Sequence, residues 1–241
     1  MLDPPPLVSI VIPTLNEAEI LPSTLEALTH QPGLYECLVV DGGSTDGTRA
    51  RARAAGVSVL EGPRGRGAQM NAGAEQVRGD LLLFLHADTT LPPNGLTQIR
   101  AALTSPSTSA GIFRLQFDRS SPLLRLYAWG TSWNWTRLCF GDRGLFATRA
   151  AFEAVGGYPD WPLFEDLELA ARLADHGDFR FLDAAVTTSA RRFDDNGILR
   201  QQLRNLYLWG HYVAGTDPDR LSHLYHYAEP SSSPRRPQNR S

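Results

Sequence analysis

The chain has few of the features that build disulfide frameworks or membrane spans. It contains only two cysteines, Cys37 and Cys139, which lie far apart and without metal-ligand spacing, so we expect neither a disulfide framework nor a cysteine-bound metal. No apolar run approaches the roughly 20 residues that a membrane-spanning helix needs. The opening segment MLDPPPLV lacks the basic and apolar regions of a signal peptide. These features predict a soluble, cytoplasmic protein.

The chain also lacks a strong excess of charge of either sign. Its 23 basic and 26 acidic residues leave a net charge of −3, which gives no global reason to expect nucleic acid or an anionic membrane as partner. Apolar residues make up 42% of the chain, enough to bury a full core. The end of the chain, 229–241, is rich in proline and serine, and we expect this tail to be disordered.

Several familiar nucleotide-binding and catalytic motifs are missing. No G-x-G-x-x-G follows the first apolar segment, so a dinucleotide fold of that kind is not indicated. The glycine-rich GPRGRGAQ (62–69) lacks the Lys-Ser/Thr ending of a P-loop, and neither H-E-x-x-H nor G-x-S-x-G occurs. Hydride transfer, P-loop phosphoryl transfer and serine hydrolysis are therefore disfavoured.

What is present in the first half is an alternation of short apolar segments with helical patterns. The predicted strands are 7–12, 35–41, 57–60 and 80–85. The predicted helices are 16–30, which begins at Asn16, then 48–55 and 67–77. Because the strand segments are continuously apolar, we expect a parallel sheet with helices on both faces.

The second half is less regular. The segment 110–117 alternates weakly, as an exposed or edge strand does, and a strand is predicted after the turn at 141–144. Predicted helices are 121–138, 165–176 and 197–214, the last two flanking a short strand pair at 179–190. We expect both halves, 7–105 and 106–228, to share one sheet in a single α/β domain spanning residues 1–228.

Three loops that carry carboxylates leave the ends of predicted strands. They are PTLNE (13–17), DGGSTDGT (41–48) and HADTT (86–90). In an open parallel sheet, ligands bind at the carboxyl ends of the strands. Acidic side chains on one rim repel each other unless a cation or a donor-rich ligand lies between them. The sequence therefore predicts a ligand site at this rim.

These loops also carry a family resemblance. The ordered set VSIVIPTLNE, LVVDGGSTDGT, HAD and GGYP with FEDLEL resembles the family 2 glycosyltransferases of GT-A fold, over roughly residues 7–190. The segments GDRGLF, GGYP, EDLEL, SARRF and GILR are similar, more narrowly, to short bacterial members whose genes accompany radical-SAM enzymes of arsenosugar biosynthesis. The resemblance implies a Rossmann-like mixed sheet and an inverting, metal-dependent hexosyl transfer from a nucleotide sugar to an acceptor hydroxyl. In the segment 199–210, Asn205 stands where processive members have a tryptophan, and no membrane helices follow, so we expect non-processive transfer.

The resemblance implies a metal ligand and a base contact. His86-Ala87-Asp88 lies where the family has Asp-x-Asp, which makes Asp88 the expected ligand of Mn²⁺ or Mg²⁺. His86 replaces the first aspartate, and a water-mediated metal contact and a sugar contact both stay open. Gly42 replaces a second aspartate that touches the nucleobase in many members. Asp41 is therefore the expected base contact, with a UDP-sugar favoured over a GDP-sugar.

The remaining site residues are expected from the same resemblance. Asp166, in the acidic pair with Glu165, is the expected general base. The expected donor-binding residues are Pro13, Thr14, Glu17, Asp41, Arg66, Asn71, His86 and Asp88.

Each of these assignments has a structural alternative. Asp41 and Glu17 are good turn-capping residues, and Arg66 suits a solvated loop as well as a phosphate. Asn71 could simply face solvent. An acidic residue such as Glu165 is favourable in a first helical turn for dipole reasons alone.

Three tryptophans at 129, 133 and 135 are read as core residues, the usual place of large aromatics. An acceptor platform or a peripheral membrane contact is the alternative, kept open by the flanking Arg125 and Arg137. The acceptor, a small molecule or a lipid-linked one, and the oligomeric state are not specified by the sequence.

Two rival functions remain. A nucleotidyltransferase would need a glycine-rich loop directly after the first strand, where this chain has Pro13-Thr14-Leu15. A non-catalytic nucleotide-sugar sensor is disfavoured by the presence of Asp88 together with the acidic pair.

Overall fold

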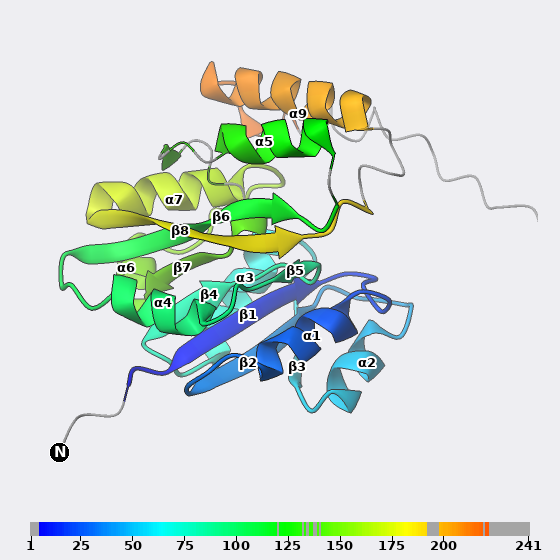
Figure 1. The fold of residues 1–241 in the computed structure, drawn as a ribbon, viewed down its shortest axis with the longest axis vertical. Coiled ribbons are helices and arrows are strands. Elements are labelled where there is room, and N and C mark those ends of the chain that lie inside the picture. Colours follow the sequence, from blue (N-terminus) through cyan, green and yellow to red (C-terminus); the bar gives the residue numbers. More distant parts are fainter. Residues whose placement is uncertain are drawn as a thin grey trace, which may run out of the picture.

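An eight-stranded mixed sheet organises the part of the chain that the structure describes (Figure 1). The strands are β1 (Val8–Thr14), β2 (Tyr35–Asp41), β3 (Ser58–Glu61), β4 (Leu81–Phe84), β5 (Thr89–Thr90), β6 (Thr108–Phe117), β7 (Leu145–Thr148) and β8 (Asp178–Thr188). Their order is β3-β2-β1-β4-β7-β6-β8-β5. The first four are mutually parallel, whereas β7 is antiparallel to both β4 and β6. The predicted parallel half and the shared mixed sheet are thus confirmed.

The computed structural model describes residues 5–119, 121–131, 133, 135–136, 139, 141–191, 198–218 and 220–221. The tail predicted to be disordered and Arg137 lie outside these residues. The helices are α1 (Leu21–Thr29), α2 (Thr48–Ala54), α3 (Arg66–Gln76), α4 (Gly95–Ala102), α5 (Pro122–Thr131), η2 (Gly141–Arg143), α6 (Arg149–Ala154), α7 (Glu165–His176) and α9 (Ile198–Val213). Within the described ranges, no helix has the length and apolar character needed to cross a membrane.

Two hydrophobic cores lie on opposite faces of the sheet, because successive side chains of a strand point to opposite sides. Val11 packs with α3, α6 and α7. Its neighbours Ile10 and Ile12 pack with α1, α2 and α4. The strands of the first half are therefore covered on both sides, which explains their continuous apolar sequences.

Two expectations for the second half are wrong. Strand β6 is not an edge strand: it lies between β7 and β8, and residues 108–113 are all buried. The strand pair expected at 179–190 is one long strand, β8, whose end pairs with β5. Its pairing with β6 is interrupted by register shifts between Thr108 and Ala110 and between Ile112 and Arg114.

Two helix boundaries also differ from the sequence prediction. Helix α1 begins at Leu21 rather than at Asn16, which has a left-handed backbone (φ 57°). The side-chain Oδ1 of Asn16 accepts a hydrogen bond from the Thr45 amide at 2.9 Å instead of capping a helix. Helix α5 ends at Thr131, so Trp133 and Trp135 follow the helix rather than lying in it.

Candidate active site

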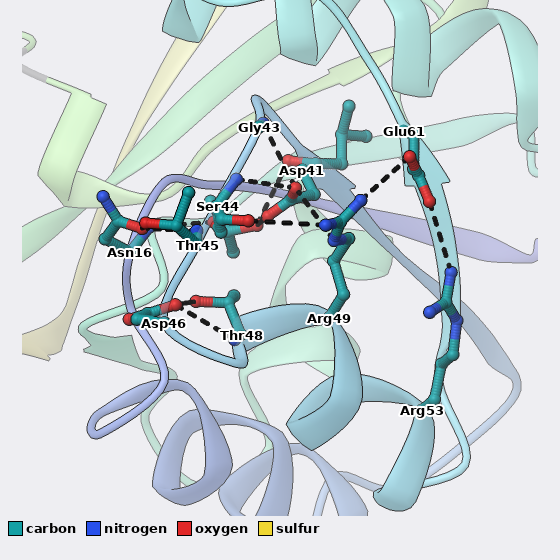
Figure 2. Close-up of polar contacts among 12 residues, drawn as sticks. Asn16, Asp41, Gly43, Ser44, Thr45, Asp46, Thr48, Arg49, Arg53 and Glu61 are labelled. Atoms are coloured by element: carbon teal, nitrogen blue, oxygen red, sulfur yellow. Dashed lines mark hydrogen bonds and ion pairs between the residues drawn. The ribbon is translucent and has the colours of Figure 1, made fainter.

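The first two acidic loops are joined to each other at the carboxyl ends of β1 and β2. Thr14 and Asp41, the last residues of these strands, are register partners. Beyond them, the backbone amides of 16, 17 and 18 donate to the side chains of Ser44, Thr48 and Asp46 at 2.8, 2.9 and 3.0 Å. The two loops therefore form one hydrogen-bonded unit at the rim (Figure 2).

Asp41 is buried beneath this unit, and its carboxylate has several protein partners. Oδ2 accepts hydrogen bonds from the amides of Gly43 and Ser44 at 3.1 and 2.9 Å. It also lies 3.6 Å from Nε of Arg49, which pairs in turn with Glu61 at 2.9 Å (Figure 2). The turn-capping alternative for Asp41 is thus seen in the structure. Arg49 was not singled out from the sequence, where it reads as one arginine of a solvated helix.

Gln69 is a second residue that sequence reasoning missed. Its side chain is buried, and Nε2 donates to the carbonyls of Thr14 and Val40 at 2.9 and 2.7 Å. A Cβ on Gly42 would lie 3.1 Å from the same nitrogen. The glutamine thus packs against Gly42, whose lack of a side chain makes room for it.

The third loop presents a carboxylate at the end of β4. The backbone of 86–88 is held from two sides: Thr24 donates to the Ala87 carbonyl at 2.7 Å, and the Ser189 amide donates to the Asp88 carbonyl at 3.0 Å. His86 is buried. Asp88 is partly exposed, and its Oδ1 accepts a long hydrogen bond of 3.4 Å from Thr89.

The donor atoms of the described residues fit a divalent cation only in combination with a ligand. In the ranges that the structure describes, no three His, Cys, Asp or Glu side chains gather into a metal cage. Mg²⁺ is usually held by one or two carboxylates together with phosphate oxygens and water. Asp88 supplies a single hard oxygen donor at the rim, which suits an ion shared with a diphosphate.

Glu17 is joined to the other end of the chain. Its Oε2 accepts a hydrogen bond from Arg191 at 2.7 Å, across 174 residues. Arg191 lies two residues beyond Ser189, which holds the Asp88 backbone. The expectation that the three acidic loops repel each other without a ligand is therefore wrong for Glu17 and Asp41, since each has an arginine partner. The segment SARRF contained this arginine, but nothing in the sequence paired it with Glu17.

The acidic pair begins α7 and is buried. Glu165 and Asp166 are 1% and 5% exposed, and Oε1 of Glu165 pairs with Nε of Arg66 at 3.0 Å. The predicted contact of Arg66 with a phosphate is thus accompanied by an ion pair to this carboxylate. Burial raises the pKa of the Tyr158 hydroxyl well above its usual value, and the carboxylates of Asp166 and Glu165 raise it further. Tyr158 therefore remains a neutral phenol beside the pair.

Asn71 connects α3 to the segment before the acidic pair. Its amide makes two hydrogen bonds of 2.9 Å with the Tyr158 backbone, donating to the carbonyl and accepting from the N–H. The side chain faces the protein rather than solvent. Pro13 and Thr14 are buried at the end of β1, beside Asp41.

The site residues thus fall into two groups. Pro13, Thr14, Glu17, Asp41, His86 and Asp88 lie at the carboxyl ends of β1, β2 and β4, and Glu165 and Asp166 lie at the start of α7. The N-terminal part of α3 contacts both groups, through Gln69 to β1 and β2 and through Arg66 to Glu165.

The sequence is similar to those of several named glycosyltransferases. The sequence of the "PGL/p-HBAD biosynthesis glycosyltransferase" of Mycobacterium bovis is 31% identical over 166 residues, 64% of this chain and 63% of the relative. This chain therefore spans less than two thirds of that relative's length. Glycosyltransferase AglE of Haloferax volcanii is 40% identical over 93 residues, 34% of this chain and 31% of that protein.

Two solved structures share the fold. The mannosyltransferase PcManGT from Pyrobaculum calidifontis, in complex with GDP-Man and Mn²⁺, has a TM-score of 0.67 at 20% identity and covers 92% of this chain and 68% of its own. Glucosyl-3-phosphoglycerate synthase from Mycobacterium tuberculosis, with Mn²⁺, UDP and glucosyl-3-phosphoglycerate, has a TM-score of 0.62 at 19% identity and covers 88% and 81%.

The fold is the GT-A fold predicted from the sequence motifs. The sequence model of glycosyl transferase family 2 matches residues 9–149, which contain all three acidic loops. This chain therefore belongs to glycosyl transferase family 2.

Proposed function

We propose that this protein is an inverting, metal-dependent glycosyltransferase that moves a hexosyl group from a nucleotide sugar to an acceptor hydroxyl, one transfer at a time. The observation that carries the proposal is the partly exposed carboxylate of Asp88 at the rim of the parallel strands, combined with a buried acidic pair at the start of α7. The Asp88 carboxylate suits a cation shared with the diphosphate of a donor, and the buried acidic pair suits proton transfer.

The donor would occupy the rim formed by β1, β2 and β4. In this proposal, Thr14 and Asp41 would contact the nucleobase, and His86 and Asp88 would face the diphosphate and the sugar. We propose Arg66 and Arg191 as partners of the phosphates, because guanidinium groups bind phosphate oxygens through paired hydrogen bonds. The two neighbours hold GDP-Man and UDP respectively. A UDP-sugar is the first donor to test.

The acceptor hydroxyl would meet Asp166. As general base, this carboxylate would take the proton while the acceptor oxygen attacks the anomeric carbon on the face opposite the nucleotide. General base assistance typically contributes about 10²–10⁴-fold to a rate. A divalent cation on Asp88 would neutralise charge that develops on the leaving diphosphate. Glu165, held by Arg66, would fix the start of α7 and hence the position of Asp166.

The proposal can be tested without knowing the acceptor, because water can replace it. The protein would be incubated with UDP-glucose, UDP-N-acetylglucosamine or GDP-mannose, with and without Mn²⁺, and release of nucleoside diphosphate would be followed. Proton NMR would give the anomeric configuration of the first sugar released. We expect metal-dependent release with inversion from one donor. Tight donor binding without release would instead identify a nucleotide-sugar sensor.

A further inference from the structure

Helices α5 and α9 carry an unusual number of exposed apolar side chains. They lie side by side at one end of the long axis of the molecule (Figure 1) and contact each other. Most of the large hydrophobic side chains that are exposed in the described residues belong to these two helices and to the segment after α5. We call them the α5–α9 surface: Leu123, Leu126, Trp129, Trp133, Trp135, Leu206 and Tyr207. The reading of the tryptophans as core residues is therefore wrong.

This exposure is not a sign of loose packing, because each helix also has buried contacts. Leu124 of α5 and Leu208 of α9 are buried. Trp135 makes an edge contact with Trp209, with ring centroids 6.1 Å apart, and Tyr212 stacks on Phe164 at 4.8 Å. Both helices are held to the protein on one side and remain apolar outside it, as interfacial helices are.

The charge of this region differs from that of the whole chain. The segments 121–141 and 198–216 contain no aspartate or glutamate, although the chain has 26 acidic residues. Both contain arginine, and Arg125 of α5 is exposed. The chain has no lysine, so its basic side chains are all arginine, which pairs bidentately with phosphate. Leucine and tryptophan mixed with arginine are typical of helices that lie in the headgroup region of a bilayer.

We propose that the α5–α9 surface binds an anionic phospholipid bilayer. Leucine and tryptophan side chains enter the boundary between headgroups and acyl chains, while arginine meets the lipid phosphates. A second copy of the chain is the less favourable occupant, since a two-fold interface places the same patch against itself. Each copy would then bring its exposed Arg125 into the same interface, and segments 121–141 and 198–216 offer no aspartate or glutamate to pair with it.

Binding on this surface places the start of α7 on the membrane side of the molecule. Tyr212 of α9 stacks on Phe164, which directly precedes Glu165. The docking itself requires no catalysis, so it stands or falls separately from the proposed function.

Vesicle flotation tests the proposal, with vesicles of phosphatidylcholine alone or mixed with phosphatidylglycerol. The wild-type protein should float with the anionic vesicles, less so with neutral vesicles and less so at high salt. The double variant Trp129→Ser, Trp133→Ser should bind the anionic vesicles at least about tenfold more weakly than the wild-type protein. Arg125→Glu should also bind them more weakly than the wild-type protein. Leu34→Ser is the matched control, since Leu34 is 60% exposed in the loop between α1 and β2.

Thermal unfolding would show that each variant is folded. Absence of wild-type flotation, equal flotation with neutral vesicles, or equal losses in the control and the double variant would overturn the proposal. So would a dimer detected by light scattering that dissociates in the tryptophan variant, because the occupant would then be a second copy.

Discussion

Asp88 differs from the other carboxylates of its rim in how its side chain is held. Asp41 accepts hydrogen bonds from two backbone amides and lies near Arg49, and Glu17 pairs with Arg191. The carboxylate of Asp88 accepts a 3.4 Å hydrogen bond from its neighbour Thr89. A partly exposed carboxylate with so weak an internal bond can bind a cation without first breaking an ion pair.

At the same scale, Asp166→Asn separates chemistry from binding. Asparagine keeps the size of the side chain but cannot accept the proton, so UDP affinity should stay within about twofold of wild type. The rate of donor turnover should fall by roughly 10²–10⁴-fold. Calorimetry with UDP and a coupled assay of nucleotide release give the two quantities. Loss of UDP binding with turnover retained would assign Asp166 to the donor site instead.

Asn71 gives a second prediction at residue scale. Asn71→Ala removes two hydrogen bonds to the Tyr158 backbone and should lower the free energy of unfolding by about 2 kcal/mol. Affinity for UDP should change much less, because the amide faces the protein. Urea denaturation and calorimetry measure both, with Gln98→Ala on the exposed face of α4 as control. A large loss of UDP affinity at unchanged stability would show a direct donor contact.

At the scale of elements, Gln69 of α3 joins the ends of β1 and β2. Its side-chain nitrogen bonds to one carbonyl of each strand and would lie 3.1 Å from a Cβ at 42, so an alanine there would require the glutamine to shift. We predict that Gln69→Ala lowers the free energy of unfolding by roughly 1–3 kcal/mol, because two buried carbonyls lose their donor. Gly42→Ala should also destabilise the protein, because the added methyl group displaces the Gln69 side chain from the same carbonyls.

A double-mutant cycle tests this coupling. The added methyl group at 42 should cost much less when Gln69 is already alanine, so the double variant should be more stable than the sum of the single effects predicts. Additive losses would mean that Gly42 is required for a reason other than the packing of Gln69.

Elements whose formation depends on local sequence could be predicted, and those that depend on distant partners could not. Continuous apolar runs predicted β1 and β2, because both faces of those strands are buried. The helical spacing of apolar residues predicted α7, because one face of that helix is buried. Strand β6 was misread as an edge strand, since its central place depends on pairing with β8, about 70 residues away.

The candidate site shows the same division. Asp41, Asp88 and Asp166 stand out in the sequence because they belong to short ordered motifs. Arg191 and Gln69 do not, because their roles come from contacts with Glu17 and with two strand ends that no local pattern encodes. The tryptophans were misread because burial is the usual state of large aromatics, whereas here Trp129 on α5 and Trp133 and Trp135 after it are exposed.

At the scale of the whole molecule, the two cysteines predict a loss of stability in alkaline solution. Burial raises the pKa of Cys37 and of Cys139 from 9.0 to about 12. Between these values the unfolded chain loses both thiol protons while the folded protein keeps them, so the free energy of unfolding falls as pH rises. The slope is about 1.4 kcal/mol per pH unit for each thiol.

Urea denaturation between pH 8 and 11 measures this effect. The double variant Cys37→Ala, Cys139→Ala should show a shallower fall than wild type, and the difference between the two curves isolates the thiols from other groups. Identical curves would contradict the raised pKa of the two thiols.

The central claim, that Asp88 holds a cation shared with a nucleotide, is tested most directly by calorimetric titration of UDP into metal-free protein, repeated with Mn²⁺. The wild-type protein and Asp80→Asn, an exposed carboxylate at the opposite end of β4, should bind UDP far more tightly with the metal than without it. Asp88→Asn should lose most of that difference while unfolding at the wild-type temperature. Equal UDP affinity with and without Mn²⁺, or a metal effect of unchanged size in Asp88→Asn, would contradict the account.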